Sequence, residues 1–278
     1  MRKVKIVADS SADLLALNTV PFESVPLKVI TAEREYVDDE ALDVETMVDE
    51  LAHYKGRSSS SCPNASEWLA AFGDADEVYC VAITATLSGS YNAACLAKAQ
   101  YEEEHPDRRV YVVNSLSAGP GLQLLVEKLK ELVADGRAFE DVCVAIEHYR
   151  QKTGLLFSLE SMINFANNGR VSPLVAKAAG LFGIRVVGKA SDEGDLQPLD
   201  KCRGEEKAVS AVAAHLVELG YDGGRVCIHH CQNERAATAL RDKVWAKFPE
   251  AAVEIRPCRG LCSFYAEHGG LLVGYERG

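Results

Sequence analysis

The sequence predicts an α/β fold of two domains, the first built on a mainly parallel sheet flanked by helices. Short apolar runs alternate with segments of helical periodicity through the N-terminal half, a pattern typical of strands joined by crossover helices. Residues 78–83 are almost uniformly apolar, as expected for a strand buried on both faces. The length of 278 residues suits one large domain or two modest ones.

The elements of the first half follow one another as strand, turn and helix. Residues 4–7 form a predicted strand that ends in the polar turn Asp9-Ser10-Ser11. Asp43 caps a predicted helix in which Val44, Met47, Val48 and Leu51 recur at helical spacing. Further strands are expected at residues 25–30, 78–83 and 110–113, and further helices at 66–72, 91–101, 122–132 and 139–151.

The second half is less regular, and we place a domain boundary between 1–155 and 156–278. The pattern leaves open an exchange of segments between these halves, with the ligand bound between or beside them. Residues 164–177 carry a turn at 167–170, and 191–196 form a polar hairpin turn with Gly194. Strands are expected at residues 155–158, 184–187, 225–229, 253–257 and 269–275, and helices at 205–219 and 234–248.

The composition excludes several classes of protein. Thirty basic and 41 acidic residues give a net charge of −11, which argues against nucleic acid and anionic membrane surfaces as partners. The apolar fraction of 47% argues against a disordered chain. The apolar runs are too short to span a membrane, and the N-terminus lacks the apolar stretch of a signal peptide. We therefore expect a cytoplasmic protein whose nine cysteines are reduced.

The most informative segment is the turn Leu87-Ser88-Gly89-Ser90 after the strand at residues 78–83. Free N–H groups at the start of the following helix and the Ser88 hydroxyl favour an anionic ligand. The alternative is that Ser88 or Ser90 only caps the helix. Similar turns, Asp9-Ser10-Ser11 and Asn114-Ser115-Leu116-Ser117, follow two other strands. Because strand ends share one sheet edge, this edge is predicted to bind an anionic or hydroxylated ligand.

Other motifs have an ordinary explanation beside a functional one. The run Ser58-Ser59-Ser60-Ser61-Cys62-Pro63 is either a polar linker or a set of hydroxyls at a ligand. Neither a GxGxxG nor a GxxxxGK[ST] pattern is present, which weighs against nucleotide sites. Arg170 is either an anion contact or a solvated side chain.

Serine-nucleophile and metal sites are both poorly supported. Ser88 lacks the flanking glycines of a G-x-S-x-G elbow, and no spacing supports a triad of Ser88 with His268 and Asp9. Cys227, His229 and Cys231 alternate along a predicted strand, which indicates packing on one face; no metal site is predicted.

Six short segments follow one another along the chain: VADSSADL at residues 7–14, SSCP at 60–63, LSGSY at 87–91, NSLSA at 114–118, NGRVS at 168–172 and KCRG at 201–204. Their order and spacing resemble the DegV family, bacterial fatty-acid-binding proteins that act as the lipid-carrying subunit of fatty acid kinase. The resemblance spans residues 4–275 and implies two α/β domains with a fatty acid between or within them.

The resemblance implies roles for particular residues. Ser60 and Ser88 correspond to the hydroxyls that hold the fatty acid carboxylate, and Ser61 and Gly89 adjoin them. Arg170 corresponds to an arginine associated with kinase docking and phosphate handling.

The chain departs from the family pattern at four positions. Ser60 replaces a Thr, Cys62 a Gln and Asn114 an Asp. At the C-terminus a family histidine aligns with Tyr265 rather than with His268, which we keep as a second candidate for contact with the partner or phosphate.

The predicted function is that of a carrier, not an enzyme. It binds a long-chain fatty acid and presents the carboxylate to an ATP-binding kinase subunit, which makes the acyl phosphate. No cofactor is expected. The alternatives are a stand-alone serine hydrolase or phosphotransferase that uses Ser88 on a small anion, and a sensor or structural module that uses bound lipid for assembly.

Overall fold

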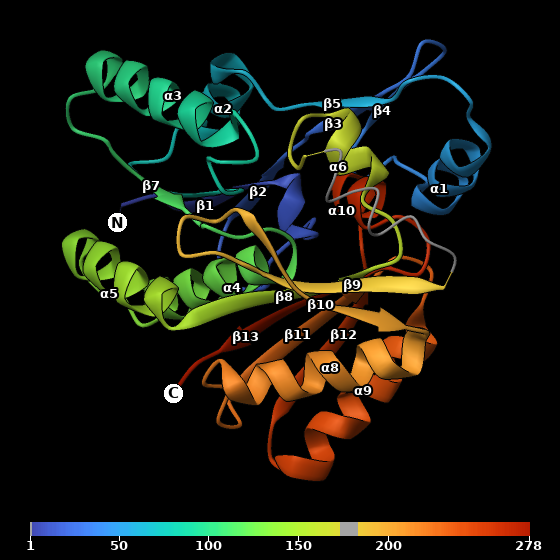
Figure 1. Ribbon diagram of the computed structural model, residues 1–278. Helices are drawn as coiled ribbons and strands as arrows, with labels where there is room; N and C mark the ends of the chain where they lie inside the picture. The colour runs from blue at the N-terminus through green and yellow to red at the C-terminus, as the bar shows by residue number, and fades with distance from the viewer. Residues whose placement is uncertain (1, 173–182) are drawn as a thin grey trace.

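Two large β-sheets lie one above the other, with helices between them and on their outer faces (Figure 1). The computed structural model describes residues 2–172 and 183–278. The arrangement confirms the predicted α/β class with a parallel sheet in the N-terminal part.

The N-terminal sheet is parallel throughout and has the strand order β2-β1-β6-β7. Its strands are β1 (Val4–Asp9), β2 (Phe22–Val25), β6 (Glu77–Ala82) and β7 (Arg109–Asn114). Every residue of β6 is buried, in agreement with the apolar run that predicted it. The carboxyl ends of these strands meet at one edge, where the predicted polar turns lie together.

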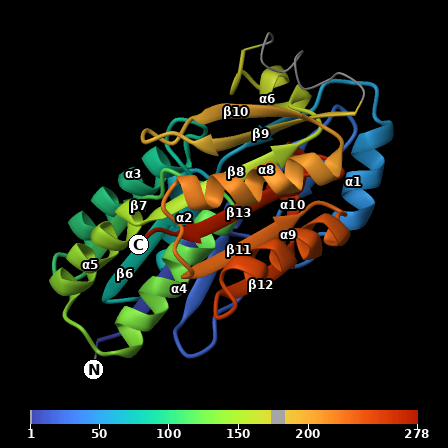
Figure 2. The same ribbon diagram turned by 60° about the horizontal axis from the view of Figure 1, so that its bottom comes forward.

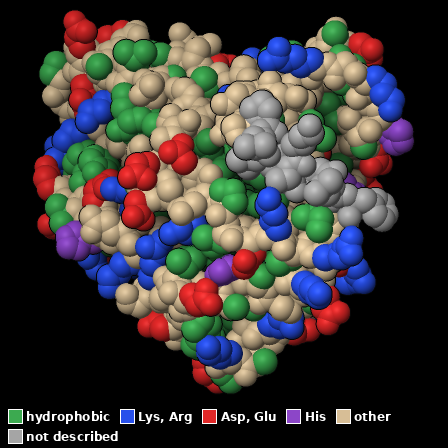
Figure 3. All heavy atoms as spheres, in the orientation of Figure 1, with side chains coloured by type: hydrophobic (Ala, Val, Ile, Leu, Met, Phe, Trp, Pro, Cys, Tyr) green, Lys and Arg blue, Asp and Glu red, His purple; other side chains and the backbone are tan. Residues whose placement is uncertain are grey.

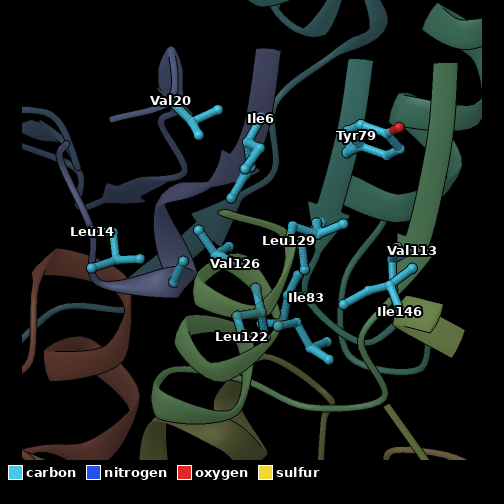
Figure 4. Close-up of a cluster of buried hydrophobic side chains, with 14 of the residues drawn as sticks. Ile6, Leu14, Val20, Tyr79, Ile83, Val113, Leu122, Val126, Leu129 and Ile146 are labelled. Carbon is cyan, nitrogen blue, oxygen red and sulfur yellow. The ribbon is translucent and has the colours of Figure 1, made fainter. Parts of the chain in front are cut away.

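Four helices cover this sheet. They are α2 (Ala65–Phe72), α3 (Ser90–Glu104), α4 (Pro120–Ala134) and α5 (Phe139–Gln151). Helices α2 and α3 pack on one face, and α4 and α5 pack on the other (Figure 1). Figure 4 shows side chains of α4 beneath Ile6, Tyr79 and Val113 of the sheet.

The C-terminal sheet has the order β10-β9-β8-β13-β11-β12. Its strands are β8 (Thr153–Leu159), β9 (Ile184–Ala190), β10 (Leu196–Arg203), β11 (Arg225–His230), β12 (Ala252–Pro257) and β13 (Leu271–Glu276). All neighbours run antiparallel except β11 and β12. Helices α8 (Glu205–Glu218) and α9 (Glu234–Lys247) cover its outer face (Figure 2).

Helix α4 lies between the two sheets and packs on both. It contacts β1 and β6 on one side and β8, β11 and β13 on the other. The approach to β13 is close, because a Cβ atom at Gly274 would lie 2.6 Å from the backbone of Pro120. The last strand of the N-terminal sheet ends at Asn114, and the first strand of the C-terminal sheet begins at Thr153. Because α4 lies between these strands and packs on both sheets, the domain boundary at residue 155 stays a prediction.

A small antiparallel sheet, β4-β3-β5, lies at one end of the molecule. It consists of β3 (Lys28–Ile30), β4 (Glu35–Val37) and β5 (Ser59–Ser61). The stretch at residues 25–30 is therefore divided between two sheets. The serine run forms β5, in which Ser60 pairs with Val29. Helices α1 (Val44–His53), α6 (Ile163–Asn167) and α10 (Gly260–Ala266) lie at this end.

Helix starts follow local sequence signals. The Asp43 side chain accepts a hydrogen bond from the Thr46 amide at 3.1 Å, which confirms the predicted cap of α1. Asn64 and Glu67 form a reciprocal capping box at the start of α2.

Several elements were not predicted, among them α6, α10, β4 and β10. Helix α10 has six buried residues among its seven and therefore no amphipathic pattern. Strand β10 is mostly exposed and lacks a clear alternation. Of the segment at 164–177, residues 173–177 lie outside the described part. Among the described residues no helix is long and apolar enough to cross a bilayer.

Candidate functional site

An apolar cavity of about 270 Å³ lies between the carboxyl ends of β6 and β7 and one face of the C-terminal sheet. The loops after β6 and β7 form one side, and strands β8 and β13 form another. Its apolar lining includes Ile83, Leu87, Leu155, Phe157, Leu159 and Leu272. The cavity therefore adjoins the sheet edge at which the sequence predicts a ligand.

Several of the polar side chains that line the cavity come from β5, the Ser88 turn and α10. The Oγ atom of Ser60 lies 2.7 Å from the hydroxyl oxygen of Tyr265. A Cβ atom at Gly89 would lie 3.2 Å from the Sγ atom of Cys62, so β5 and the Ser88 turn are adjacent. The structure thus brings together the predicted residues Ser60 and Ser88, and Ser61 and Gly89 line the same cavity.

A buried carboxylate holds the turn that carries Ser88. Asp9, at the end of β1, accepts hydrogen bonds from the Ser90 hydroxyl at 2.7 Å and from the Ile83 amide at 2.9 Å. The Ser11 hydroxyl donates to its other oxygen. Burial raises the pKa of Asp9, and these hydrogen bonds oppose the rise. Asp9 therefore fixes both ends of the loop from Ile83 to Ser90.

Arg170 reaches the same turn from the loop after α6. Its Nε atom donates to the carbonyl oxygen of Leu87 at 3.1 Å, and its Nη1 atom donates to that of Asn168 at 2.5 Å. The side chain is half-buried and lines the cavity. A permanent positive charge thus lies beside the turn of Ser88.

The C-terminal candidates, Tyr265 and His268, lie in different places. Tyr265 lines the cavity and stacks on Phe165 with ring centroids 4.6 Å apart. Burial raises its pKa, so the hydroxyl is a neutral donor. His268 is exposed and lines a separate cavity beside α1 and Glu267. The physical reason is the left-handed Glu267, with φ of 54°, which ends α10 and turns the chain away.

The hairpin between β9 and β10 forms part of the cavity wall. Gly194 at its tip has φ of 88° and lines the cavity. A Cβ atom there would lie 2.1 Å from the Oγ1 atom of Thr84 and 3.0 Å from the Cα atom of Leu116. Only glycine permits this approach of the hairpin to the edge of the N-terminal sheet.

The described residues do not form a serine triad or a metal centre. The Ser88 hydroxyl accepts from the Ser90 amide at 3.3 Å, Asp9 binds the loop rather than a histidine, and His268 lies elsewhere. Within residues 2–172 and 183–278, no three His, Cys, Asp or Glu side chains are placed to hold a metal ion. Cys227 and Cys231 are buried, as the packing interpretation expects, whereas the buried His229 contacts Asp13 and Gln123 through its ring nitrogens.

Sequence reasoning missed several polar residues around the cavity. Asp9 was recognised only as part of a turn, and its contact with the Ser90 hydroxyl is visible only in the fold. The available signal was an aspartate directly after a buried strand. His229 was assigned to packing, although its Nδ1 atom lies 2.7 Å from an oxygen of Asp13. No spacing in the sequence indicates that pair.

Charged side chains of both signs are interspersed on the face drawn in Figure 3. The acidic balance of the whole chain therefore does not produce a single negative patch on that face. The polar side chains in the wall of the apolar cavity are hydroxyls and Arg170.

Known proteins resemble this chain over its whole length. A DegV domain-containing protein of Streptococcus pneumoniae is 46% identical over 276 residues, which cover 98% of each chain. The crystal structure of the S. pneumoniae Fatty Acid Kinase (Fak) B3 protein loaded with linoleic acid superposes with a TM-score of 0.97 at 45% identity, covering 99% of this chain and 100% of that one.

A second solved structure gives a similar match. The DegV family protein of Eubacterium eligens loaded with heptadecanoic acid has a TM-score of 0.96 at 42% identity, covering 99% of this chain and 100% of its own. A family model described as an uncharacterised protein of the DegV family matches residues 3–277. This chain belongs to the DegV family.

Proposed function

We propose that this protein is a carrier that binds a long-chain fatty acid in the apolar cavity and presents its carboxylate to a kinase. The observation that carries the proposal is an apolar cavity whose wall includes the hydroxyls of Ser60, Ser88 and Tyr265. The fatty acids in the S. pneumoniae and E. eligens structures support this class of ligand.

The cavity supplies the energy of binding mainly through its apolar walls. Burying about 14 methylene groups at about 0.8 kcal/mol each gives roughly 11 kcal/mol of gross driving force. Part of this is offset by the ordering of ligand and protein. The carboxylate still needs partners, because an unpaired charge is costly to remove from water.

Ser60 and Ser88 are proposed to hold the carboxylate, with the Tyr265 hydroxyl beside Ser60. Ser61 and Gly89 shape the same surface. Neutral donors suit a carboxylate that is to be phosphorylated, because they bind it without transferring a proton to it. No cofactor takes part in this role.

Arg170 is proposed to face the kinase or the transferred phosphate. Its hydrogen bond to Leu87 places it beside the Ser88 turn, and guanidinium groups suit phosphate oxygens. The partner is an ATP-binding fatty acid kinase subunit, in line with the S. pneumoniae Fak B3 relative. We propose a cytoplasmic location, where such a kinase has ATP.

Ligand loading followed by native mass spectrometry tests the proposal. The delipidated protein is expected to take up heptadecanoic acid in a one-to-one complex. Ser88→Ala should weaken retention about tenfold or more, because a hydrogen bond to a charged group contributes about 1.5–3 kcal/mol. Ser210→Ala, on an exposed position of α8, is the matched control. A wild-type protein that cannot be loaded would overturn the carrier function.

A stand-alone enzyme that uses Ser88 is the alternative. Turnover of an activated ester by wild type but not by Ser88→Ala, persisting after lipid removal, would favour it. Acyl phosphate formed only when kinase and ATP are added would favour the carrier over both the enzyme and a lipid sensor.

A further inference from the structure

Two buried carboxylates from the N-terminal part hold the first turn of α10. Asp13 accepts a hydrogen bond from the Arg259 amide at 2.8 Å. Asp38 accepts from the Gly260 amide at 2.8 Å and from the Leu261 amide at 2.9 Å. These consecutive amides have no partner within the helix, so the position of α10 depends on side chains that lie more than 200 residues away in sequence.

The same helix forms part of the cavity wall. Leu261, Cys262, Tyr265 and Ala266 all line the cavity, and Tyr265 contacts Ser60. A movement of the first turn of α10 would therefore displace both the apolar cavity wall and the Tyr265 hydroxyl. The junction is tight, since a Cβ atom at Gly260 would lie 2.7 Å from an oxygen of Asp38.

A buried histidine lies beside Asp13. The Gln123 amide nitrogen donates to Glu127 at 2.8 Å and to Glu254 at 2.7 Å, so its oxygen faces the Nε2 atom of His229 at 2.6 Å. The Nδ1 atom of His229 lies 2.7 Å from an oxygen of Asp13, so the ring bridges Asp13 and Gln123.

The cation beside Asp38 lies at a longer distance. The Nε atom of Arg259 lies 3.7 Å from it, while the guanidinium of Arg259 donates to the carbonyl oxygen of Asp39. Burial raises the pKa of Asp38 to about 6, with the nearby charge of Asp13 acting in the same direction and the α10 amides and Ser10 opposing it.

Among the described residues, the titratable groups at this junction also include two buried thiols and the Tyr265 hydroxyl of α10, whose pKa burial raises. Burial raises the pKa of Cys258 and of Cys262 well above the ordinary thiol value, so both stay neutral near pH 6. Asp38 therefore changes charge in the mildly acidic range while these neighbours do not.

We propose that Asp13 and Asp38 are positioning residues for the cavity, and that protonation of Asp38 loosens α10 and lowers fatty acid retention. The inference rests on the proposed fatty acid binding. Protonation of Asp38 turns one of its two acceptor oxygens into a hydroxyl and removes the negative charge, so the hydrogen bonds to the α10 amides become weaker.

Equilibrium binding of heptadecanoic acid to the full chain between pH 5 and 8 tests the proposal. Wild-type affinity is expected to fall about tenfold across pH 6, in line with the weakening of hydrogen bonds to a charged group. Asp38→Asn should bind about tenfold more weakly at pH 7.5 and lose that part of the pH dependence. Asp74→Asn, which removes an exposed carboxylate paired with Lys3, should match wild type. Titration of the ligand itself is common to all three proteins.

The pH dependence of the unfolding free energy of the ligand-free protein distinguishes a loss of α10 positioning from general unfolding. The folded-state pKa of Asp38, about 6, is above its ordinary value of 3.8, so the folded protein binds more protons between these values. The contribution of Asp38 to stability therefore grows as the pH falls from 6 to 4. Retention that falls over the same pH range cannot come from Asp38-driven unfolding.

Hydrogen exchange of the amides of residues 259–261 provides a second measurement without ligand. Asp38→Asn and Gly260→Ala, which keeps both carboxylates but separates them from the helix, should each speed exchange there. Folded variants with wild-type exchange, affinity and pH profile would overturn the proposal. A wild type that binds no heptadecanoic acid at any pH overturns the proposed function instead, and exchange alone then decides whether the carboxylates hold α10.

Discussion

The polar and apolar parts of the cavity are built in different ways. The polar part, around Ser60 and Ser88, comes from a short strand and a loop whose positions depend on hydrogen bonds to Asp9 and Tyr265. The apolar part comes from β8 and β13, whose side chains are fixed by the sheet itself. Changes in the two parts should therefore have separable effects: apolar changes should cost more unfolding free energy and alter which acyl chain is preferred, whereas polar changes should cost less stability and weaken fatty acid binding.

The largest effect is expected from Phe157→Ala in β8. Phe157 is 1% exposed and lines the cavity, so its loss should lower the free energy of unfolding by about 3–5 kcal/mol. The enlarged cavity should shift the preference toward longer or bulkier acyl chains. Urea unfolding and competition between acyl chains, followed by mass spectrometry, measure both.

Phe72→Ala is the matched control for that substitution. Phe72 is 0% exposed in the core between α2 and the N-terminal sheet and does not line the cavity. It should cost a similar free energy of unfolding without changing chain preference. If both variants shift the preference equally, stability rather than cavity shape controls selection.

A smaller effect is expected from Asp9→Asn. The amide retains one acceptor but presents an NH₂ group to a site where the Ser11 and Ser90 hydroxyls and the Ile83 amide all donate. We expect a loss of about 2 kcal/mol in unfolding free energy and weaker fatty acid retention. Ser11→Ala removes one donor only and should cost about 1 kcal/mol. Equal retention by Asp9→Asn and wild type would show that the Ser88 turn does not need this anchor.

The smallest effect is expected from Tyr265→Phe. It removes the hydroxyl that contacts Ser60 but keeps the ring stacked on Phe165. Stability should change by less than about 1 kcal/mol. A double-mutant cycle with Ser60→Ala, measured on heptadecanoic acid binding, should show a coupling of about 0.5–1 kcal/mol. Additive effects would mean that the two hydroxyls do not act together on the ligand.

The polar part of the site was more predictable from the sequence than the apolar part. Ser88 follows a buried strand and precedes a helix, so its position at the sheet edge follows from local pattern alone. Phe157 and Leu159 cannot be distinguished in sequence from ordinary core residues, because cavity and core require the same apolar side chains.

Long-range polar contacts were beyond the reach of local pattern for a different reason. Asp38 and Gly260 lie more than 200 residues apart, and their hydrogen bond exists only because α10 packs against β3 and α1. A buried seven-residue helix has no amphipathic stripe that could reveal it. The domain boundary stayed ambiguous because α4 contributes to both cores.

The shared helix α4 also bears on how the chain is made. Ribosomal synthesis completes the N-terminal sheet and α4 before β8 to β13 emerge, so one face of α4 must wait for its partner strands. That face carries Gln123 and Glu131, whose contacts with β11 and β12 form only in the finished protein. A nascent chain stopped near residue 150 is therefore expected to stay open to proteolysis or bound by a chaperone until the C-terminal sheet forms.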